Sequence, residues 1–323
     1  MTKLRLTAAL TLVVGMAAAA GTPARAWDAN GHRVVARIAW EDLRPETRAW
    51  LAAVLATAPP DADLASLLAA DGRPLAVRQR ELFELASTWP DIVRDAKRPE
   101  RQAKYHHPSW HYTSWFWERP DPQAAPRERL DLAINPENPM ERLHYFQATL
   151  ADPGRAAAQK AVDVAWVLHL VGDIHMPLHC ASRVTPTEPR GDQGANLFQL
   201  DPEHKNLHAF WDSILTLALP RQAGEDDDAY IGRLASLIAA GHPKAAVAAR
   251  LDLGHYEAWA NDGYDTAKTR VYLADLERGK APSPAYQRHA LEIAEPAIAL
   301  AGYRLAATLE LLAAANSPKP GGT

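Results

Sequence analysis

The sequence predicts a mainly α protein built as a single multi-helix domain. Apolar residues recur at three- and four-residue steps over most of the chain, and alternating strand patterns are scarce. Neither a low-complexity linker nor an internal repeat divides the sequence. Of the 323 residues, 47% are hydrophobic and 23% are charged, which is ordinary globular composition and excludes disorder and coiled coils.

Residues 1–26 are predicted to be a secretory signal peptide. Lys3 and Arg5 precede an apolar run over residues 6–20, and Ala24-Arg25-Ala26 forms a small-x-small cleavage site. A membrane anchor is the alternative, but the run is short for a span. Cleavage would make Trp27 the N-terminus and leave 32 Lys and Arg against 39 Asp and Glu, a net charge of −7. We therefore expect a periplasmic or secreted protein without a strongly basic surface.

The expected helices follow the apolar periodicity in chain order. They cover residues 31–40, 46–56, 75–86, 156–175, 206–219, 226–240, 255–276 and 283–315. Pro45 suits a first turn, Pro220 ends the fifth helix, and Pro296 is expected to kink or stagger the last one. Segments rich in Pro, Gly and charge are expected to be long loops, over 95–109, 118–139 and 181–204. The domain is thus predicted over 27–316, with a disordered tail over 317–323.

The single cysteine, Cys180, excludes an intramolecular disulfide. Exported proteins commonly use disulfides for stability. This chain must instead rely on a large core, on bound metal, or on both. For Cys180 itself, packing in the core is favoured over a role as an extra soft metal ligand.

Histidines are concentrated in one part of the chain, since nine of the 13 lie between residues 106 and 208. His169 and Asp173 are four residues apart in the most apolar helix, and His208 and Asp212 repeat this spacing. Such pairs project from one helix face. Each pair alone could be a core His–Asp hydrogen bond, but two pairs favour a metal, and zinc suits this mixture of nitrogen and oxygen ligands.

Further candidate ligands lie outside the two pairs. His179 follows Pro177, which is expected to end a helix, whereas His175 is expected to be solvated or hydrogen-bonded in the core. Asp91 is either a ligand or a helix N-cap. His111, between aromatic residues, is either a ligand or structural.

The processed terminus offers a further candidate site. The α-amino group of Trp27 has a reference pKa near 8, so zinc could displace its proton close to neutral pH. The amine nitrogen and the Trp27 carbonyl oxygen would form a five-membered chelate. His32 follows one turn later.

These fragments together resemble one family. They are Trp27-Asp-Ala-Asn-Gly-His32, Trp89-Pro-Asp91, Trp110-His-Tyr112, His169-Leu-Val-Gly-Asp173, Pro177-Leu-His179, Asn206-Leu-His-Ala-Phe-Trp-Asp212 and Ala301-Gly-Tyr-Arg-Leu-Ala306. In their order they resemble the secreted zinc-dependent single-strand nucleases and 3′-nucleotidases of fungi and plants, which also have bacterial members. The resemblance implies a mainly α domain of the zinc phospholipase C and single-strand nuclease type, in which long loops cover a trinuclear zinc site.

Carried over by position, the resemblance assigns a ligand set to each of three Zn²⁺ ions. One zinc takes Asp91, His111 and His169; a second takes the Trp27 amine and carbonyl with His32; Asp173 bridges these two; the third takes His179, His208 and Asp212. All nine residues are present with the required type.

Two segments depart from the family pattern. The glycine-glycine-asparagine loop appears here as Gly194-Ala-Asn196, where Asn196 is expected to contact substrate. Ser114 stands where fungal members carry a base-reading aspartate, which puts base preference in doubt. Fungal members also have disulfides, which this chain cannot make.

The resemblance implies hydrolysis of single-stranded RNA and DNA to 5′-monophosphates by a metal-bridged hydroxide, together with 3′-nucleotidase activity. Asp91 would orient the hydroxide, and Arg94 would either neutralise charge in the transition state or form a surface salt bridge. Tyr112 would either stack on an unpaired base or belong to the core. Three Zn²⁺ and three aspartates leave the pocket at about +3, so metal would attract the polyanion.

Three other functional interpretations of the sequence remain open at this point. A zinc-dependent phospholipase C would share the fold, the three-zinc site and the N-terminal tryptophan. A periplasmic zinc-binding protein without catalysis would take up metal but hydrolyse nothing, and a structural helical protein would bind no zinc. If the protein is a nuclease, we expect single-stranded nucleic acid and 3′-nucleotides as substrates. We also expect a monomer that does not associate with a membrane once the signal peptide is removed.

Overall fold

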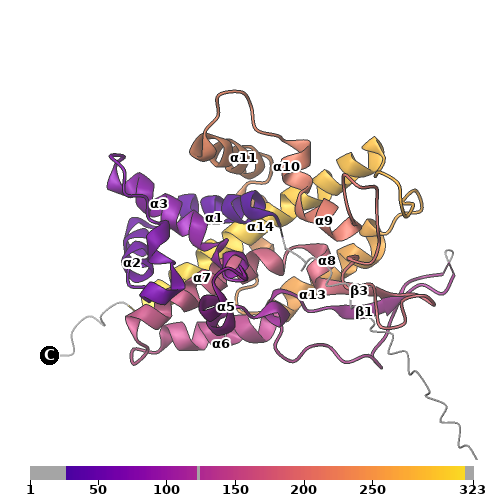
Figure 1. The fold of residues 1–323 in the computed structure, drawn as a ribbon, viewed down its shortest axis with the longest axis horizontal. Helices are drawn as coiled ribbons and strands as arrows, with labels where there is room; N and C mark the ends of the chain where they lie inside the picture. The colour runs from indigo at the N-terminus through magenta and orange to yellow at the C-terminus, as the bar shows by residue number, and fades with distance from the viewer. Residues whose placement is uncertain (1–26, 122–123, 317–323) are drawn as a thin grey trace, which may run out of the picture.

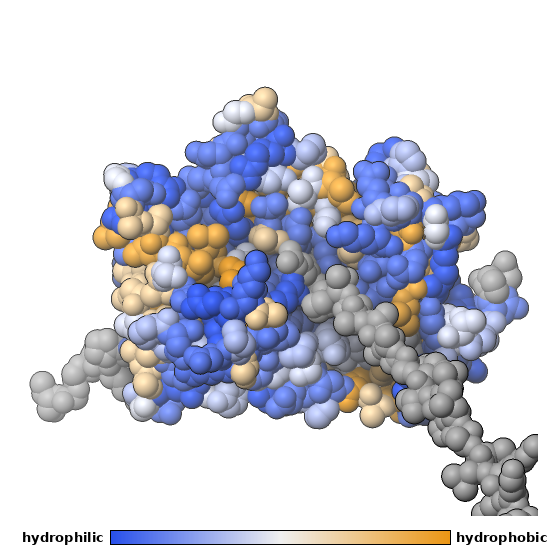
Figure 2. Space-filling model, viewed as in Figure 1, coloured by the Kyte–Doolittle hydropathy of each residue, from blue (hydrophilic) through white to orange (hydrophobic). Residues whose placement is uncertain are grey.

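The computed structural model describes residues 27–121 and 124–316, so the predicted signal peptide and the tail lie outside the described residues. Within them the chain is mainly helical, which confirms the predicted fold class, and its longest helix runs through the middle of the molecule (Figure 1). The face seen in Figure 2 is mostly hydrophilic, as expected for a globular domain.

The α-helices are α1 (Ala29–Asp42), α2 (Pro45–Leu55), α3 (Leu75–Ala86), α4 (Trp89–Ile92), α5 (Pro99–Tyr105), α6 (Pro139–Ala151), α7 (Ala157–Asp173), α8 (Pro177–Cys180), α9 (Leu207–Asp212), α10 (Ile214–Ala218), α11 (Asp227–Gly241), α12 (Lys244–Val247), α13 (Tyr256–Thr266) and α14 (Pro284–Asn316). Short 3₁₀ turns are η1 (Pro60–Ala62), η2 (Ala65–Leu67), η3 (Pro108–His111) and η4 (Ala248–Arg250), and a π-helical turn η5 (Ala267–Val271) follows α13.

Helices α1, α7 and α14 form the interior of the molecule. Helix α14 packs against both α1 and α7, and α7 is buried from Lys160 to Asp173. Gly302 allows α1 and α14 to approach closely, because a Cβ there would lie only 2.5 Å from Ile38 Cγ2. The interior therefore holds the helix that carries His169 and Asp173.

Among the described residues one helix, α14, is long and apolar enough to cross a membrane by length and composition. However, 72% of its most apolar window is buried inside the fold. A core helix of a globular protein passes the same test, so α14 is explained by its packing.

A small sheet connects two loops that carry candidate ligands. Its order is β2 (Arg127–Glu128), β1 (Trp115–Glu118) and β3 (Ala181–Val184); β1 is antiparallel to β2 and parallel to β3. Trp115 lies opposite Ala181. Because β1 follows His111 by a few residues and β3 follows α8 directly, the pairing of β1 with β3 holds His111 and His179 near each other.

Several predicted boundaries were wrong for local reasons. Helix α6 was not predicted; Asn138 caps it by accepting hydrogen bonds from two backbone N–H groups. The helix predicted over 206–219 breaks at Ser213, which leaves helical geometry at φ −97° and ψ 3°. The helix predicted over 255–276 ends at Val271, and α5 lies inside a predicted loop. The helix predicted over 283–315, in contrast, is confirmed as α14, which contains Pro296.

Candidate metal centre

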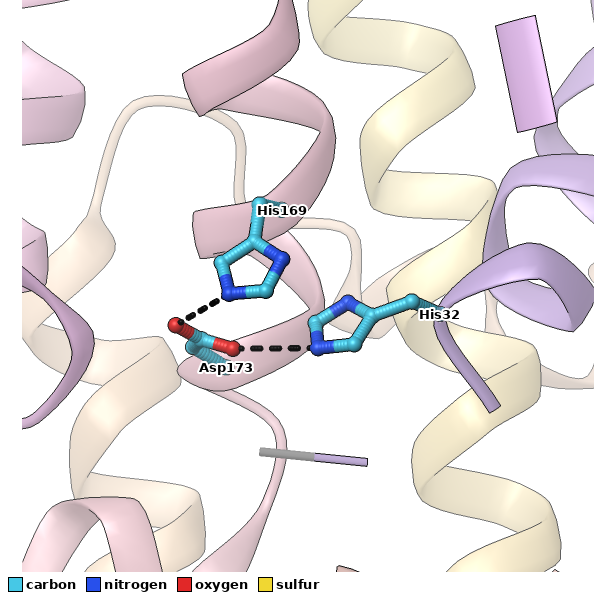
Figure 3. A group of neighbouring side chains, drawn as sticks. All are labelled: His32, His169 and Asp173. Atoms are coloured by element: carbon cyan, nitrogen blue, oxygen red, sulfur yellow. Dashed lines mark ion pairs between the residues drawn. The ribbon is translucent and has the colours of Figure 1, made fainter. Parts of the chain in front are cut away.

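Helix α7 places an imidazole and a carboxylate on one buried face. His169 Nε2 lies 3.3 Å from Asp173 Oδ2, and both side chains are fully buried. His32 reaches the same carboxylate from α1, with its Nε2 3.3 Å from Asp173 Oδ1 (Figure 3). The His32 ring also stacks on His169, with 4.0 Å between ring centroids. Asp173 thus presents one oxygen to each of two histidines from different helices.

His111 and Asp91 complete this first group. His111 Nδ1, in η3, lies 3.0 Å from Asp173 Oδ2 and 3.0 Å from His169 Nε2. Candidate donor atoms of Asp91, His111 and His169 all lie within 4.8 Å of one another. Asp91 is the third residue of α4, whose N-cap is Thr88, so the N-cap alternative for Asp91 was wrong.

A second group comes from α8 and α9. His179 Nε2 and His208 Nε2 are 3.2 Å apart, and His208 Nε2 lies 3.5 Å from Asp212 Oδ1. Asn206 starts α9 by accepting a hydrogen bond from the Ala209 N–H at 2.8 Å. This cap sets the start of the helix that aligns His208 with Asp212.

Backbone carbonyls determine which ring nitrogen of each histidine is available. The Nδ1–H groups of His169, His179 and His208 donate to the carbonyls of Ser87 (2.7 Å), His111 (2.5 Å) and Gly194 (2.6 Å). In the neutral rings, Nε2 then carries a lone pair. The Nε2 lone pairs of His179 and His208 face each other, an arrangement that a cation between them stabilises. Metal-binding histidines characteristically make this outer hydrogen bond.

Burial keeps the histidines of the first group neutral. It lowers the pKa of His32 well below its ordinary value, lowers that of His169, and lowers the pKa of His111 to about 4. Neutral imidazole is the form that binds a metal. Burial also raises the pKa of Asp173 well above its ordinary value, because a buried carboxylate is costly unless a cation balances it.

Unsatisfied atoms in this group fit a divalent cation. Within the described chain, neither ring nitrogen of His32 forms a hydrogen bond, although both are buried, and the same holds for Asp173 Oδ1. Buried polar atoms without partners are rare in folded proteins. A metal bound between His32 Nε2 and Asp173 Oδ1 would satisfy these two atoms.

Trp27 lies at the start of α1 and is fully buried. The next residue, Asp28, caps α1 by accepting from the Gly31 N–H at 2.9 Å, and its own N–H donates to the Asp212 carbonyl at 2.8 Å. Gly31 leaves room for the tryptophan, since a Cβ there would lie 2.6 Å from Trp27 Cβ. The chain just after residue 26 is therefore held between His32 and Asp212.

A cleft of about 870 Å³ opens beside both groups, and His111 and His208 line it. The predicted substrate-binding residues Tyr112 and Asn196 also line it, as does Arg94. Tyr112 is 37% exposed, so the alternative that placed it in the core was wrong. Arg94 Nη1 lies 3.3 Å from Asp91 Oδ1 and both side chains are largely buried, so this ion pair belongs to the cleft and not to the outer surface.

Comparison with known proteins identifies the family. The model of the S1/P1 nuclease family matches residues 27–314. The chain belongs to the S1/P1 nuclease family. No curated protein matches it. Membership confirms the family expected from the motifs, and makes the protein a hydrolase that acts on nucleic acid.

This S1/P1 nuclease keeps its remaining candidate residues in the core. His175 Nδ1 donates to the Val171 carbonyl at 2.7 Å, and its Nε2 accepts from Arg304 at 2.8 Å, as the core-bonded alternative predicted. The Cys180 thiol is buried and donates to the Ile174 carbonyl at 3.3 Å. Burial raises the pKa of the thiol, which favours packing over thiolate chemistry.

The two departures from the family pattern both have left-handed backbone. Gly194, at φ +61°, approaches Leu178 so closely that a Cβ would lie 2.3 Å from its carbonyl oxygen. Ala195 adopts φ +67° and Ser114 adopts φ +52°, a conformation that is costly for residues other than glycine. Such strain often lies at functional sites. The alanine is therefore accommodated in the loop without loss of the Gly194 contact.

Sequence reasoning missed two cations of this nuclease, Arg190 and Lys205, which line the cleft. Neither belongs to a motif: Arg190 lies in the predicted loop 181–204, and Lys205 lies between that loop and the helix predicted from residue 206. Since loop positions carry no periodicity, nothing in the spacing indicated their direction.

Proposed function

We propose that the mature chain, starting at Trp27, binds three zinc ions and hydrolyses phosphodiester bonds in single-stranded RNA and DNA to 5′-monophosphates. We further propose that it removes the phosphate from 3′-nucleotides. One observation carries the metal assignment: buried neutral histidines from separate helices converge on Asp173 and on each other. Nitrogen and oxygen donors in this combination suit zinc.

The proposed ligands form three sets. They are Asp91, His111 and His169; the Trp27 amine and carbonyl with His32; and His179, His208 and Asp212, while Asp173 is shared by the first two. Zinc bound there would act as a Lewis acid and lower the pKa of bound water to about 7.

The remaining residues of the cleft would orient the substrate. Arg94 lies beside Asp91, where its guanidinium would balance charge that develops on the phosphate. Asp91 would accept a hydrogen bond from the attacking water. Tyr112, partly exposed in the cleft, would stack on a base, and Asn196 would contact the nucleotide.

Preference for single strands follows from this stacking. A duplex hides the faces of its bases, so a base must leave the stack before Tyr112 contacts it. The proposal also includes that the protein is exported after cleavage of residues 1–26 and acts as a monomer. In support of this cleavage site, the family match begins at Trp27, the first residue after the predicted signal peptide.

The test uses the mature protein purified without added metal. Elemental analysis should find about three zinc ions per chain. Single-stranded RNA and DNA should be cut faster than duplex, with 5′-monophosphate products, and 3′-adenosine monophosphate should lose its phosphate. Chelation should abolish these activities, and zinc should restore them. Zinc without hydrolysis would identify a binding protein, and turnover of phosphatidylcholine alone would identify a phospholipase; either result would refute the proposal.

A further inference from the structure

The wall of the cleft formed by residues 190–206 carries two cations without acidic partners. Arg190 and Lys205 both line the cleft and are exposed. In the part of the chain that the structure describes, neither side chain forms an ion pair or a hydrogen bond. Most other arginines and lysines are paired with carboxylates, including Arg94 in the same cleft. Exposed cations that face a cleft without partners are suited to bind an anion.

The two acidic side chains nearest in sequence to Arg190, those of Glu188 and Asp192, are already hydrogen-bonded to other groups. Glu188 accepts from Arg278 Nη2 at 2.7 Å and 2.9 Å. The same Arg278 donates to the Leu197 carbonyl, so it also supports the opposite part of this wall. Arg278 thereby leaves Arg190 available for a ligand.

The wall is held rigidly in a strained shape. Gln193 and Lys205 adopt left-handed backbone at φ +56° and φ +62°. Asp192 is fully buried and accepts hydrogen bonds from the Tyr272 hydroxyl at 2.6 Å and the Ala195 N–H at 3.1 Å. Gly191 packs so tightly that a Cβ would lie 2.2 Å from Ser182 Oγ. A preformed wall binds a ligand with little loss of conformational entropy.

The two cations occupy different positions along the cleft. Lys205 directly precedes the cap of α9 and therefore lies close to the group that contains His208. Arg190 directly precedes Gly191, which packs against Phe116 of β1. Leu197, 38% exposed, adds apolar surface to the same wall. The wall thus offers both cations and apolar surface, which suit the phosphates and bases of a single strand.

We propose that Arg190 and Lys205 form a phosphate subsite for the polynucleotide backbone, separate from the phosphate that is hydrolysed. This inference rests on the proposed function and names its preferred substrate class, which is a single strand of several nucleotides. A 3′-mononucleotide has no second phosphate to place there. Arg190 and Lys205 thus select for chain length and take no part in bond cleavage.

The experiment compares the double variant Arg190→Ala/Lys205→Ala with Lys97→Ala/Arg288→Ala. The second variant removes the same two charges at exposed positions that do not line the cleft. Each enzyme is assayed on a single-stranded oligonucleotide of about ten nucleotides and on 3′-adenosine monophosphate, over a range of salt concentrations. Because both cleft cations are exposed and unpaired, the variant should melt within about 2 °C of wild type.

For the oligonucleotide, KM of the cleft variant should rise about tenfold or more, while kcat stays near wild type. The slope of log KM against log salt should fall by about 1.4, since each phosphate contact with a single strand contributes about 0.7. For 3′-adenosine monophosphate, KM should change less than twofold. An equal rise for both substrates, or an oligonucleotide effect no larger than in the control variant, would overturn the inference.

Failure of the proposed function would give a different result. If wild type hydrolysed neither substrate, the binding of a fluorescently labelled oligonucleotide would be measured by anisotropy. Weaker binding by the cleft variant than by the control would still support the subsite, whereas equal binding would overturn it.

Discussion

Individual hydrogen bonds determine which atoms of the candidate site face a cation. His179 and His208 each use Nδ1–H for a backbone carbonyl, and this leaves the two Nε2 atoms 3.2 Å apart. A simple core histidine such as His175 differs, because both of its ring nitrogens have hydrogen-bond partners. An Nε2 atom that faces the donor atom of another candidate ligand is therefore the feature that separates these histidines from a structural histidine.

Substitution of Gly172 by alanine tests this geometry, because it adds a single methyl group next to His32. A Cβ at this position would lie 2.6 Å from His32 Nδ1, so Gly172→Ala should displace His32 from Asp173. We expect zinc content to fall by about one ion and kcat/KM to fall by a factor of about 100 or more.

The matched control is Gly241→Ala, in α11, where an added Cβ has no neighbour within 4 Å. This variant should keep zinc and activity and should change stability by less than about 1 kcal/mol, because Gly241 is the last residue of its helix. Full zinc content in Gly172→Ala would show that His32 is not a ligand.

Asp173 is the carboxylate shared by most of the first group. Asp173→Asn removes its charge without changing its size, and we expect kcat/KM to fall by a factor of about 1,000 or more with loss of zinc. The contrasting change is Asp201→Asn. Asp201, Glu203 and His204 also lie within 4.8 Å of one another, but this group is more exposed and lies outside the proposed set. Metal analysis and kinetics of both variants check the prediction, and similar losses in both would contradict it.

Secondary structure elements bring the site residues together from distant parts of the chain. The parallel pairing of β1 with β3 is extended by the Thr113 N–H, which donates to the His179 carbonyl at 2.8 Å. His179 in turn donates to the His111 carbonyl. These bonds couple the two metal groups through the backbone.

Backbone hydrogen bonding also positions the start of α1, since the Asp28 N–H donates to the Asp212 carbonyl. The residue at which the mature chain begins should therefore affect metal binding. An additional alanine before Trp27 would move the free amine away from His32. We expect this extended protein to lose at least one zinc and about 100-fold or more in activity while its far-ultraviolet circular dichroism stays unchanged. A matched protein with an alanine added after residue 316 should behave as wild type. Full zinc and activity in the N-terminal extension would refute amine ligation.

Helix α1 is also anchored by a buried charge cluster. Glu84 of α3, fully buried, forms ion pairs with Arg37 and, at 3.7 Å, with Arg33; Arg37 also pairs with Asp228 of α11. Glu84→Gln should destabilise the fold by about 3 kcal/mol, because Arg33 and Arg37 lose their buried ionised partner and keep only more exposed carboxylates.

Glu81→Gln is the comparison, since Glu81 pairs with the exposed Arg73 and should cost only about 0–1 kcal/mol. Urea denaturation of both variants measures the difference. Equal midpoints would show that Glu84 does not anchor α1.

Helices with a regular apolar period could be predicted from the sequence, whereas helix caps, helix breaks and loop conformations could not. The four-residue spacing of His169 with Asp173 placed both on one face of α7, because helix geometry alone determines that outcome. The break at Ser213 and the start of α6 at Asn138 depend on capping and on tertiary contacts that no periodicity records. The wall that carries Arg190 depends on left-handed backbone outside regular structure.

At the scale of the whole molecule, metal would replace the disulfides that the chain lacks. Its one cysteine is buried in the core, and the site removes many polar side chains from water. Without a cation, the buried Asp173 and the facing histidines are uncompensated. Folding and zinc binding should therefore be linked.

This linkage predicts a large effect of chelation on thermal stability. A ligand present at 100 times its Kd stabilises the folded state by about 2.7 kcal/mol, and three sites add their contributions. At about 2–4 °C per kcal/mol for a domain of this size class, removal of zinc should lower Tm by more than about 10 °C. Calorimetry with and without a chelator measures the shift, and added zinc should reverse it. Asp173→Asn serves as the control, because a protein already depleted of zinc should lose less on chelation. An unchanged Tm in wild type would show that the core alone stabilises the fold.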